Sequence, residues 1–215
     1  RHLYNITLER VAVVHVDDSF GADCLAGAMK GFEAAGKKPL TVIKADREKP
    51  DYPAIVKELT AKQAQAVLWI GSSTAVSEGV KALRQAGSAA QVVTVSNNAS
   101  SGFIKQLGTY SHGVVVSQVF PSVRALGLPL NREANAMLNG KNELTPQVME
   151  GFASAKVLVE ALRRAGPNPT RERIIDALNR MDKYDLGGLS LGYSPTDHTG
   201  LDYVDLAIID RTGRF

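Results

Sequence analysis

The feature of this sequence that most constrains the fold is a regular alternation of short apolar, β-branched runs with longer stretches of helical periodicity. The first run, Val11–Val16, is apolar almost without interruption, as is typical of a strand buried on both faces of a sheet. Apolar residues then recur at helical spacing from Leu25 to Phe32, and Gly36 is a suitable end for that helix. This alternation predicts an α/β fold with a doubly wound parallel sheet.

The alternation continues through five strands and then changes. The predicted strands are 11–16, 39–44, 66–70, 91–95 and 113–120, and the predicted helices are 21–36, 51 to about 59, 73–86 and 100–107. After Pro121, helical segments at about 131–139, 145–165 and 170–181 follow one another without strands. Strands return at about 189–193 and 203–209, around a turn-rich segment at 194–200. We therefore expect the chain to leave one α/β lobe, contribute helices to another, and return.

Composition excludes several classes of protein. The 215 residues carry 25 Lys and Arg against 22 Asp and Glu, interspersed along the chain, so no basic face for nucleic acid is indicated. Cys24 is the single cysteine, and the four histidines lack metal-ligand spacing, which argues against a disulfide scaffold or a structural metal site. Every apolar run is far shorter than the roughly 20 residues that cross a bilayer. We expect no cofactor, no metal, no nucleic acid and no direct insertion into a membrane.

A candidate site follows from the predicted sheet. With strand order 2-1-3-4-5, ligands bind at the carboxyl ends of the strands, where the order reverses between strands one and three. Polar and aromatic residues follow the strands at this edge, and we take as candidates Ser19, Phe20, Ser72, Ser73, Thr74, Asn97, Asn98 and Phe120. Hydroxyls and amides suit hydrogen bonding to a small polar ligand, and helix N-termini attract a carboxylate or phosphate. The alternative role of serines that precede helices, such as Ser19 and Ser73, is helix capping.

The same loops can be examined for the sequence motifs of enzymes and of phosphorylation switches. The loop after the first strand, Asp17–Gly21, lacks the GxGxxG pattern of dinucleotide-binding folds, and the chain has no P-loop motif. A receiver domain would share Asp17 and Asp18 but would need an aspartate and a lysine where this chain has Gly71-Ser72 and Gln118. The loops also lack a His or Lys that could activate a serine nucleophile. We therefore expect a binding protein rather than an enzyme.

Taken together, several stretches resemble a known family. They are Val11–Gly21, Val67–Gly71 with its following helix, Val115–Pro121, Glu150–Gly166, Pro169–Leu178, Gly187-Gly188 and His198–Gly200. In order and spacing they are similar to the extracytoplasmic solute-binding proteins of ABC transporters, in the branched-chain amino-acid-binding (Leu/Ile/Val-binding) branch of the type I periplasmic-binding fold. The resemblance covers nearly the whole chain.

The resemblance implies a protein of two lobes that traps a small-molecule ligand in the cleft between them, resides in the periplasm, and delivers the ligand to the membrane permease of an ABC transporter. It implies that this chain is the C-terminal two-thirds of such a protein. Residues 8–120 and 188–215 would form the second α/β lobe, and residues 122–186 would be a helical block contributed to the first lobe. A ligand-sensing regulatory domain of the same fold is the alternative function.

The resemblance also assigns roles to single residues. Phe20 falls at the position of the aromatic residue that packs on the ligand, Ser72–Thr74 falls at the turn after the third strand, and the polar position after the fourth strand falls at Asn97 or Asn98. In family members that bind α-amino acids, the residue at this position after the fourth strand is acidic. A neutral amide cannot compensate an ammonium group by charge but can bond a carboxylate, hydroxyl or carbonyl. We therefore expect a small carboxylate-bearing solute, such as an amino acid, a modified amino acid or an aromatic acid.

Overall fold

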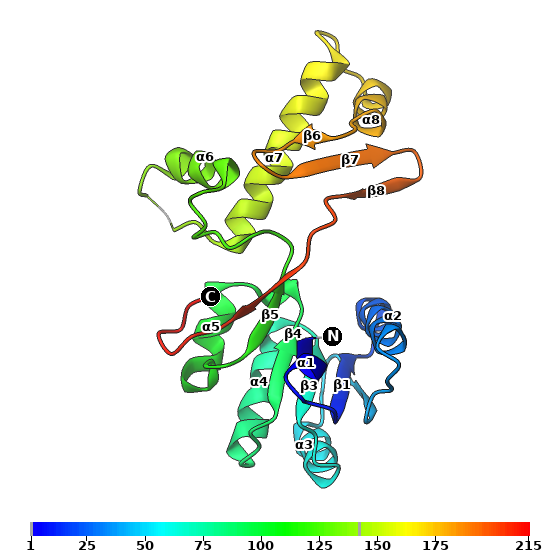
Figure 1. The fold of residues 1–215 in the computed structure, drawn as a ribbon, viewed down its shortest axis with the longest axis vertical. Helices are drawn as coiled ribbons and strands as arrows, with labels where there is room; N and C mark the ends of the chain where they lie inside the picture. Colours follow the sequence, from blue (N-terminus) through cyan, green and yellow to red (C-terminus); the bar gives the residue numbers. More distant parts are fainter. Residues whose placement is uncertain (1, 142) are drawn as a thin grey trace. The chain divides into compact units, whose positions relative to one another are not determined.

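The computed structural model describes residues 2–141 and 143–215, which form two compact units (Figure 1). The first unit extends to Ser117 and includes Leu206–Phe215, and the second unit is Gln118–Asp205. The strands of the first unit are β1 Val11–Val16, β2 Val42–Ala45, β3 Ala66–Ile70, β4 Gln91–Thr94, β5 Val115–Gln118 and β9 Asp205–Ile208, of which β5 and β9 extend to the boundary with the second unit. Its α-helices are α1 His2–Asn5, α2 Ser19–Ala34, α3 Tyr52–Ala61, α4 Ser73–Gln85 and α5 Ser101–Leu107. Two 3-10 helices, η1 Ser96–Asn98 and η2 Gly108–Tyr110, precede and follow α5.

The sheet of the first unit has the strand order β2-β1-β3-β4-β5-β9. The pairs β1–β2, β1–β3, β3–β4 and β4–β5 are parallel. The predicted doubly wound order 2-1-3-4-5 is therefore confirmed, and β9 extends the sheet at its β5 edge. The order reverses beside β1, since β1 pairs with β2 on one side and with β3 on the other.

Every residue of β1 is buried, as its unbroken apolar run predicts. On one face of the sheet Ala12 and Val14 belong to a core cluster with residues of α3, α4 and α5. On the other face Val11 and Val13 cluster with Phe32 of α2. Side chains that alternate between two apolar layers fix the register of β1, because a one-residue slip would exchange the two sets.

Helix α2 and strand β2, which both lie beside the end of β1, begin at different residues from those predicted. Helix α2 begins at Ser19 rather than 21, because the Asp18 side chain caps it by accepting a hydrogen bond from the Gly21 N–H at 2.7 Å. Strand β2 begins at Val42 rather than 39 and ends at Ala45. The loop that follows β2 therefore starts at Asp46, next to the end of β1.

The second unit contains three helices and a small antiparallel sheet. The helices are α6 Pro129–Leu138, α7 Pro146–Ala165 and α8 Arg171–Asn179, and the strands are β6 Tyr184–Asp185, β7 Ser190–Ser194 and β8 Asp197–Gly200. Buried Met149, Ala153 and Met181 form its core together with Leu191 of β7. The three predicted helices are thus present, with ends shifted by a few residues.

The strand predicted at 189–193 forms, but it does not join the parallel sheet. As β7 it pairs antiparallel with β6 and β8, two short strands that the sequence pattern did not predict. Gly187 and Gly188, at φ +115° and +92°, make the tight turn between β6 and β7, and the Asp185 carboxylate accepts hydrogen bonds from both N–H groups. The chain consequently returns to the parallel sheet at Leu206, not at 188 as expected.

The longest helix, α7, has 20 residues and carries charged side chains along its length. In residues 2–141 and 143–215, no helix combines the length and the apolar character needed to cross a membrane. Within the same residues, no group of three or more His, Cys, Asp or Glu side chains is placed to hold a metal ion.

Candidate functional site

A cavity of about 460 Å³ lies in the first unit at the carboxyl ends of three neighbouring strands. Val16, Ala45 and Ile70, the last residues of β1, β2 and β3, all line it. Because β1 lies between β2 and β3, this strand-end cavity occupies the place where the strand order reverses. Ligands of open α/β sheets bind at such a place.

Three of the eight candidate residues line the strand-end cavity: Phe20, Ser72 and Asn97. Phe20 lies in the first turn of α2 and is 39% exposed, although it is a large apolar side chain. Ser72 precedes α4, and Asn97 lies in η1 after β4. An exposed aromatic ring beside a hydroxyl and an amide provides both an apolar surface and hydrogen-bonding groups for a small ligand.

The structure distinguishes the two neighbouring asparagines. Asn98 is fully buried, accepts a hydrogen bond from the Ser73 hydroxyl at 2.9 Å, and donates to the Thr94 hydroxyl at 2.9 Å and to the Gly71 carbonyl at 3.2 Å. These bonds hold the loops after β3 and β4 together. Asn97 is exposed and donates one bond, to the Gly71 carbonyl at 3.0 Å, which leaves its carbonyl oxygen available to accept a hydrogen bond from a ligand.

In α2 and α4, helix capping falls one residue earlier than the sequence pattern suggested, whereas Ser100 caps α5. The caps of α2 and α4 are Asp18 and Ser72, whereas Ser19 and Ser73 are the first residues of those helices. The Ser72 hydroxyl accepts from the Ala75 N–H at 3.2 Å and still has a proton to donate toward the cavity. Ser19 and Thr74 are exposed and do not line the cavity.

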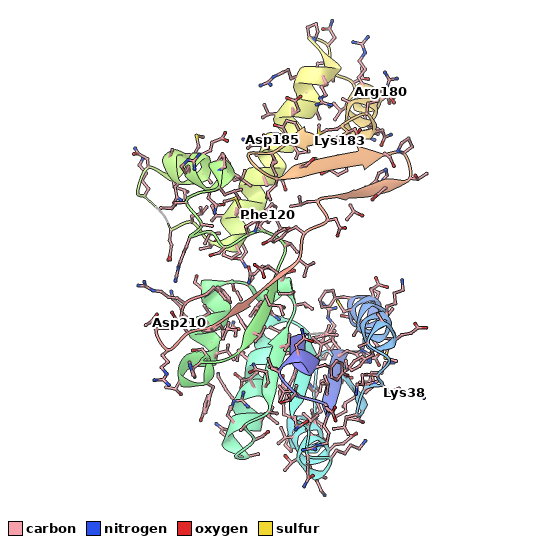
Figure 2. The ribbon with its side chains drawn as sticks, viewed as in Figure 1. Lys38, Phe120, Arg180, Lys183, Asp185 and Asp210 are labelled. Atoms are coloured by element: carbon pink, nitrogen blue, oxygen red, sulfur yellow. The ribbon has the colours of Figure 1, made fainter. Side chains whose placement is uncertain are left out.

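Phe120 belongs to the second unit and not to the strand-end cavity. Phe120, which Figure 2 labels, is partly buried and packs against that unit's core, which includes Leu130 and Met149. Ser73 and Asn98 likewise do not line the cavity, but they bond to each other behind it. The structure therefore brings Phe20, Ser72 and Asn97 together and places the other candidates elsewhere.

Sequence reasoning missed one wall of the cavity, which the loop after β2 provides. Asp46, Arg47 and Glu48 of that loop line the cavity, as does Tyr52 at the start of α3. A signal for them was present in the predicted strand order, since strand two is a neighbour of strand one and its loop must reach the same edge. Trp69 of β3, which is almost fully buried, completes the aromatic part of the lining.

Charges in and beside the cavity are arranged in pairs. The Arg47 guanidinium donates to the Asp18 carboxylate, and Lys44 pairs with Asp17 at 2.7 Å. Both ion pairs connect the loop after β1 to the region of β2. The Asp46 carboxylate accepts hydrogen bonds from the backbone N–H groups of Lys49 and Glu48, and these bonds lower the pKa of Asp46. Asp46 therefore stays ionised at neutral pH.

The side chains that line this cavity offer apolar contact and hydrogen bonds. Among the described residues that line it there is no His, Lys or Cys, and the Ser72 hydroxyl accepts a hydrogen bond from the Ala75 N–H as the cap of α4. Phe20 and Tyr52 offer apolar contact, while Ser72, Asn97 and Arg47 offer hydrogen bonds. Such a combination recognises a small polar molecule with an apolar part.

Comparison with known proteins agrees with this description. The family model described as "Periplasmic binding protein" matches residues 7–214. A substrate-binding periplasmic protein from Ralstonia solanacearum has a similar structure, with a TM-score of 0.85 and 27% sequence identity over 99% of this chain and 62% of that chain. An extracellular ligand-binding receptor from Verminephrobacter eiseniae gives a TM-score of 0.87 and 26% identity, over 99% of this chain and 62% of that chain.

A more distant solved structure shares the fold: a branched-chain amino acid ABC transporter protein from Thermus thermophilus with bound valine. It gives a TM-score of 0.82 and 18% identity, over 100% of this chain and 60% of that chain. A comparison with curated protein sequences found no match.

The chain spans about three fifths of the length of these solved relatives. The family and the solved relatives are binding proteins, not enzymes. With nearly all of its residues matched by the family model, the chain belongs to the periplasmic binding protein family.

Proposed function

We propose that the full-length protein containing this chain is an extracytoplasmic solute receptor of an ABC importer. In this proposal it binds a small carboxylate-bearing solute between two lobes in the periplasm and delivers the solute to a membrane permease. The observation that carries the proposal is the strand-end cavity, with Phe20, Ser72 and Asn97 at the reversal of strand order in a chain of this family. The printed descriptions of the solved relatives, one of them with bound valine, support the same class of function.

The ligand class is argued from the groups around the cavity. The first N–H groups of α4 have no partner within the helix, and with the helix dipole they favour a carboxylate beside Ser72. The rings of Phe20 and Tyr52 favour an apolar or aromatic body on the ligand. Asn97 is neutral and offers hydrogen bonding without a charge. Amino acids, modified amino acids and aromatic acids all fit these three features.

Binding can be tested with a thermal-shift screen of the full-length protein against amino acids, aromatic acids and short dicarboxylates. A ligand that binds only the native state raises the melting temperature. A free ligand concentration of about 100 times Kd stabilises the native state by about 2.7 kcal/mol. We expect at least one carboxylate class to raise the melting temperature, and we expect Phe20→Ala to reduce that rise. Absence of any rise across the panel would contradict the proposal.

The contribution of an ammonium group can be tested with matched pairs, such as leucine and its deaminated analogue 4-methylpentanoate. Because Asn97 carries no charge to pair an ammonium, we expect the acid without the amine to bind at least as tightly. Asn97→Asp supplies that charge and should shift the preference toward the amine. A clear preference of the unsubstituted protein for the amine would rule out this view of Asn97.

A further inference from the structure

We infer that Arg47 is a specificity-determining residue of the proposed solute site and that it selects ligands carrying a second anionic group, of the short dicarboxylate class. This inference rests on the proposed function, and it names the ligand class more closely. It concerns a residue in the loop after β2, which neither the sequence motifs nor the comparisons assign to binding.

Among the described residues that line the strand-end cavity, Arg47 is the one cation. Its side chain is 67% exposed, and one nitrogen, Nη1, donates to Oδ2 of Asp18. A guanidinium carries five N–H donors in a rigid planar fork, which matches the geometry of a carboxylate. The bond to Asp18 uses one nitrogen and leaves the other donors of the fork for a ligand.

Asp18 is held in place from a second direction. Its other oxygen, Oδ1, accepts from the Gly21 N–H at 2.7 Å as the cap of α2, and its side chain is only 18% exposed. The turn at Gly21 is tightly packed, because a Cβ there would lie 1.9 Å from the carbonyl oxygen of Val16. Asp18 therefore acts as a fixed support that positions the Arg47 guanidinium at the cavity wall.

The other charged side chains of this wall, Asp46 and Glu48, are acidic and cannot pair with a ligand carboxylate as Arg47 can. The Asp46 carboxylate accepts two backbone hydrogen bonds within its own loop, from the N–H groups of Glu48 and Lys49 at 2.8 and 2.7 Å. The Glu48 and Arg47 side chains are both exposed, so water and salt screen the two charges alike. A ligand carboxylate that enters the β2 side of the cavity consequently finds its strongest partner in Arg47.

The positions of the strands explain why the ligand needs two acidic groups. The place beside Ser72 follows β3, and Arg47 follows β2, while β1 lies between these strands. Neighbouring strands are about 4.8 Å apart, so the ends of β2 and β3 are separated by roughly 10 Å. A molecule with one carboxylate can occupy one of the two places. A short dicarboxylate can reach both, with its apolar middle against Phe20 and Tyr52.

The experiment measures dissociation constants of the full-length protein by isothermal titration for diacids and monoacids of equal carbon number. The probes are glutarate with pentanoate and adipate with hexanoate. We expect a diacid to bind about tenfold more tightly than its monoacid, which is the effect of one charge-assisted hydrogen bond. Arg47→Gln should reduce the ratio to about twofold or less, chiefly by weakening the diacid, and Arg47→Lys should give an intermediate ratio because lysine lacks the fork.

Asp18→Asn is the matched control, because asparagine caps a helix as well as aspartate does but carries no charge. If Arg47 contacts the ligand from the position that Asp18 fixes, this variant loosens the guanidinium and should lower the ratio of diacid to monoacid affinity. If Arg47 only supports the loop, Asp18→Asn and Arg47→Gln should both lower the melting temperature and weaken the binding of both acids equally, and that result would overturn the inference.

Binding of amino acids or aromatic acids with no preference for diacids would overturn the inference while the proposed function stands. Failure of every acid to bind would contradict both.

Discussion

At the scale of single residues, Asn97 and Asn98 have the same chemistry and different environments. Asn98 is buried with bonds to Ser73, Thr94 and Gly71, and Asn97 is exposed at the strand-end cavity. Which asparagine faces a ligand depends on the 3-10 turn η1 that holds them both. The sequence places two amides after the fourth strand, but a one-residue difference in a short turn cannot be read from periodicity.

This difference predicts unequal effects of the same substitution. Asn98→Ala removes the partner of the Ser73 and Thr94 hydroxyls inside the fold, so we expect it to lower the free energy of unfolding by roughly 2–3 kcal/mol. Asn97→Ala, the control, should change stability by less than about 0.5 kcal/mol, as exposed substitutions usually do. Urea denaturation followed by circular dichroism measures both values. Equal losses in the two variants would contradict the assigned environments.

Residue chemistry also explains which residues of the cavity lining could be named from the sequence. Phe20 was identifiable because α2 has an apolar stripe without it, and Ser72 because it follows a buried strand. Arg47 was not identified, because a charged residue in a loop of mixed charge looks like an ordinary solvated position. The role that we propose for Arg47 depends on its ion pair with Asp18 and on the pairing of β2 with β1, which are properties of the assembled sheet.

At the scale of elements, the parallel sheet was predictable and the small antiparallel sheet was not. The strands 11–16 and 66–70 form with the predicted bounds, because long β-branched runs between helical patterns have few alternatives. Strands β6 and β8 contain two and four residues with little apolar pattern. Their pairing depends on the turn at Gly187 and Gly188 and on Leu191, whose side chain joins the core of the second unit.

Packing of α4 on β3 gives a prediction at this scale. A Cβ at Gly79 would lie 2.1 Å from the ring of Trp69, so Gly79→Ala should overpack the core and cost about 1–3 kcal/mol of stability. The control is Gly27→Ala in α2, where nothing lies within 4 Å and alanine favours the helix by roughly 0.5–1 kcal/mol. Thermal unfolding compares the two variants with the unsubstituted protein. A stabilising Gly79→Ala would contradict the described contact between α4 and Trp69.

At the scale of the whole molecule, the chain divides into two units at positions that differ in part from the predicted ones. The first division, near residue 118, was predicted from the change of pattern after strand five. The second was expected at 188 and occurs at Leu206, because β7 and β8 pair within the second unit. A hydrophobic pattern identifies a strand but does not identify its partner, so the return point could not be read from the sequence.

The second unit also shows which apolar side chains of α7 pack within that unit. Phe152 of α7 packs against the unit's core, whereas Leu158 and Val159 are more than half exposed. Only some of the apolar side chains of α7 therefore contribute to the core of Gln118–Asp205.

The central claim, that the strand-end cavity is where this protein holds its solute, is tested most directly by nuclear magnetic resonance. The measurement follows backbone amide shifts of the full-length protein while it is titrated with the acid that most raises its melting temperature. The account predicts saturable shifts at Phe20, Arg47, Ser72 and Asn97, with the Kd found by calorimetry. A ligand that binds with that Kd and leaves these four amides unchanged would contradict the claim.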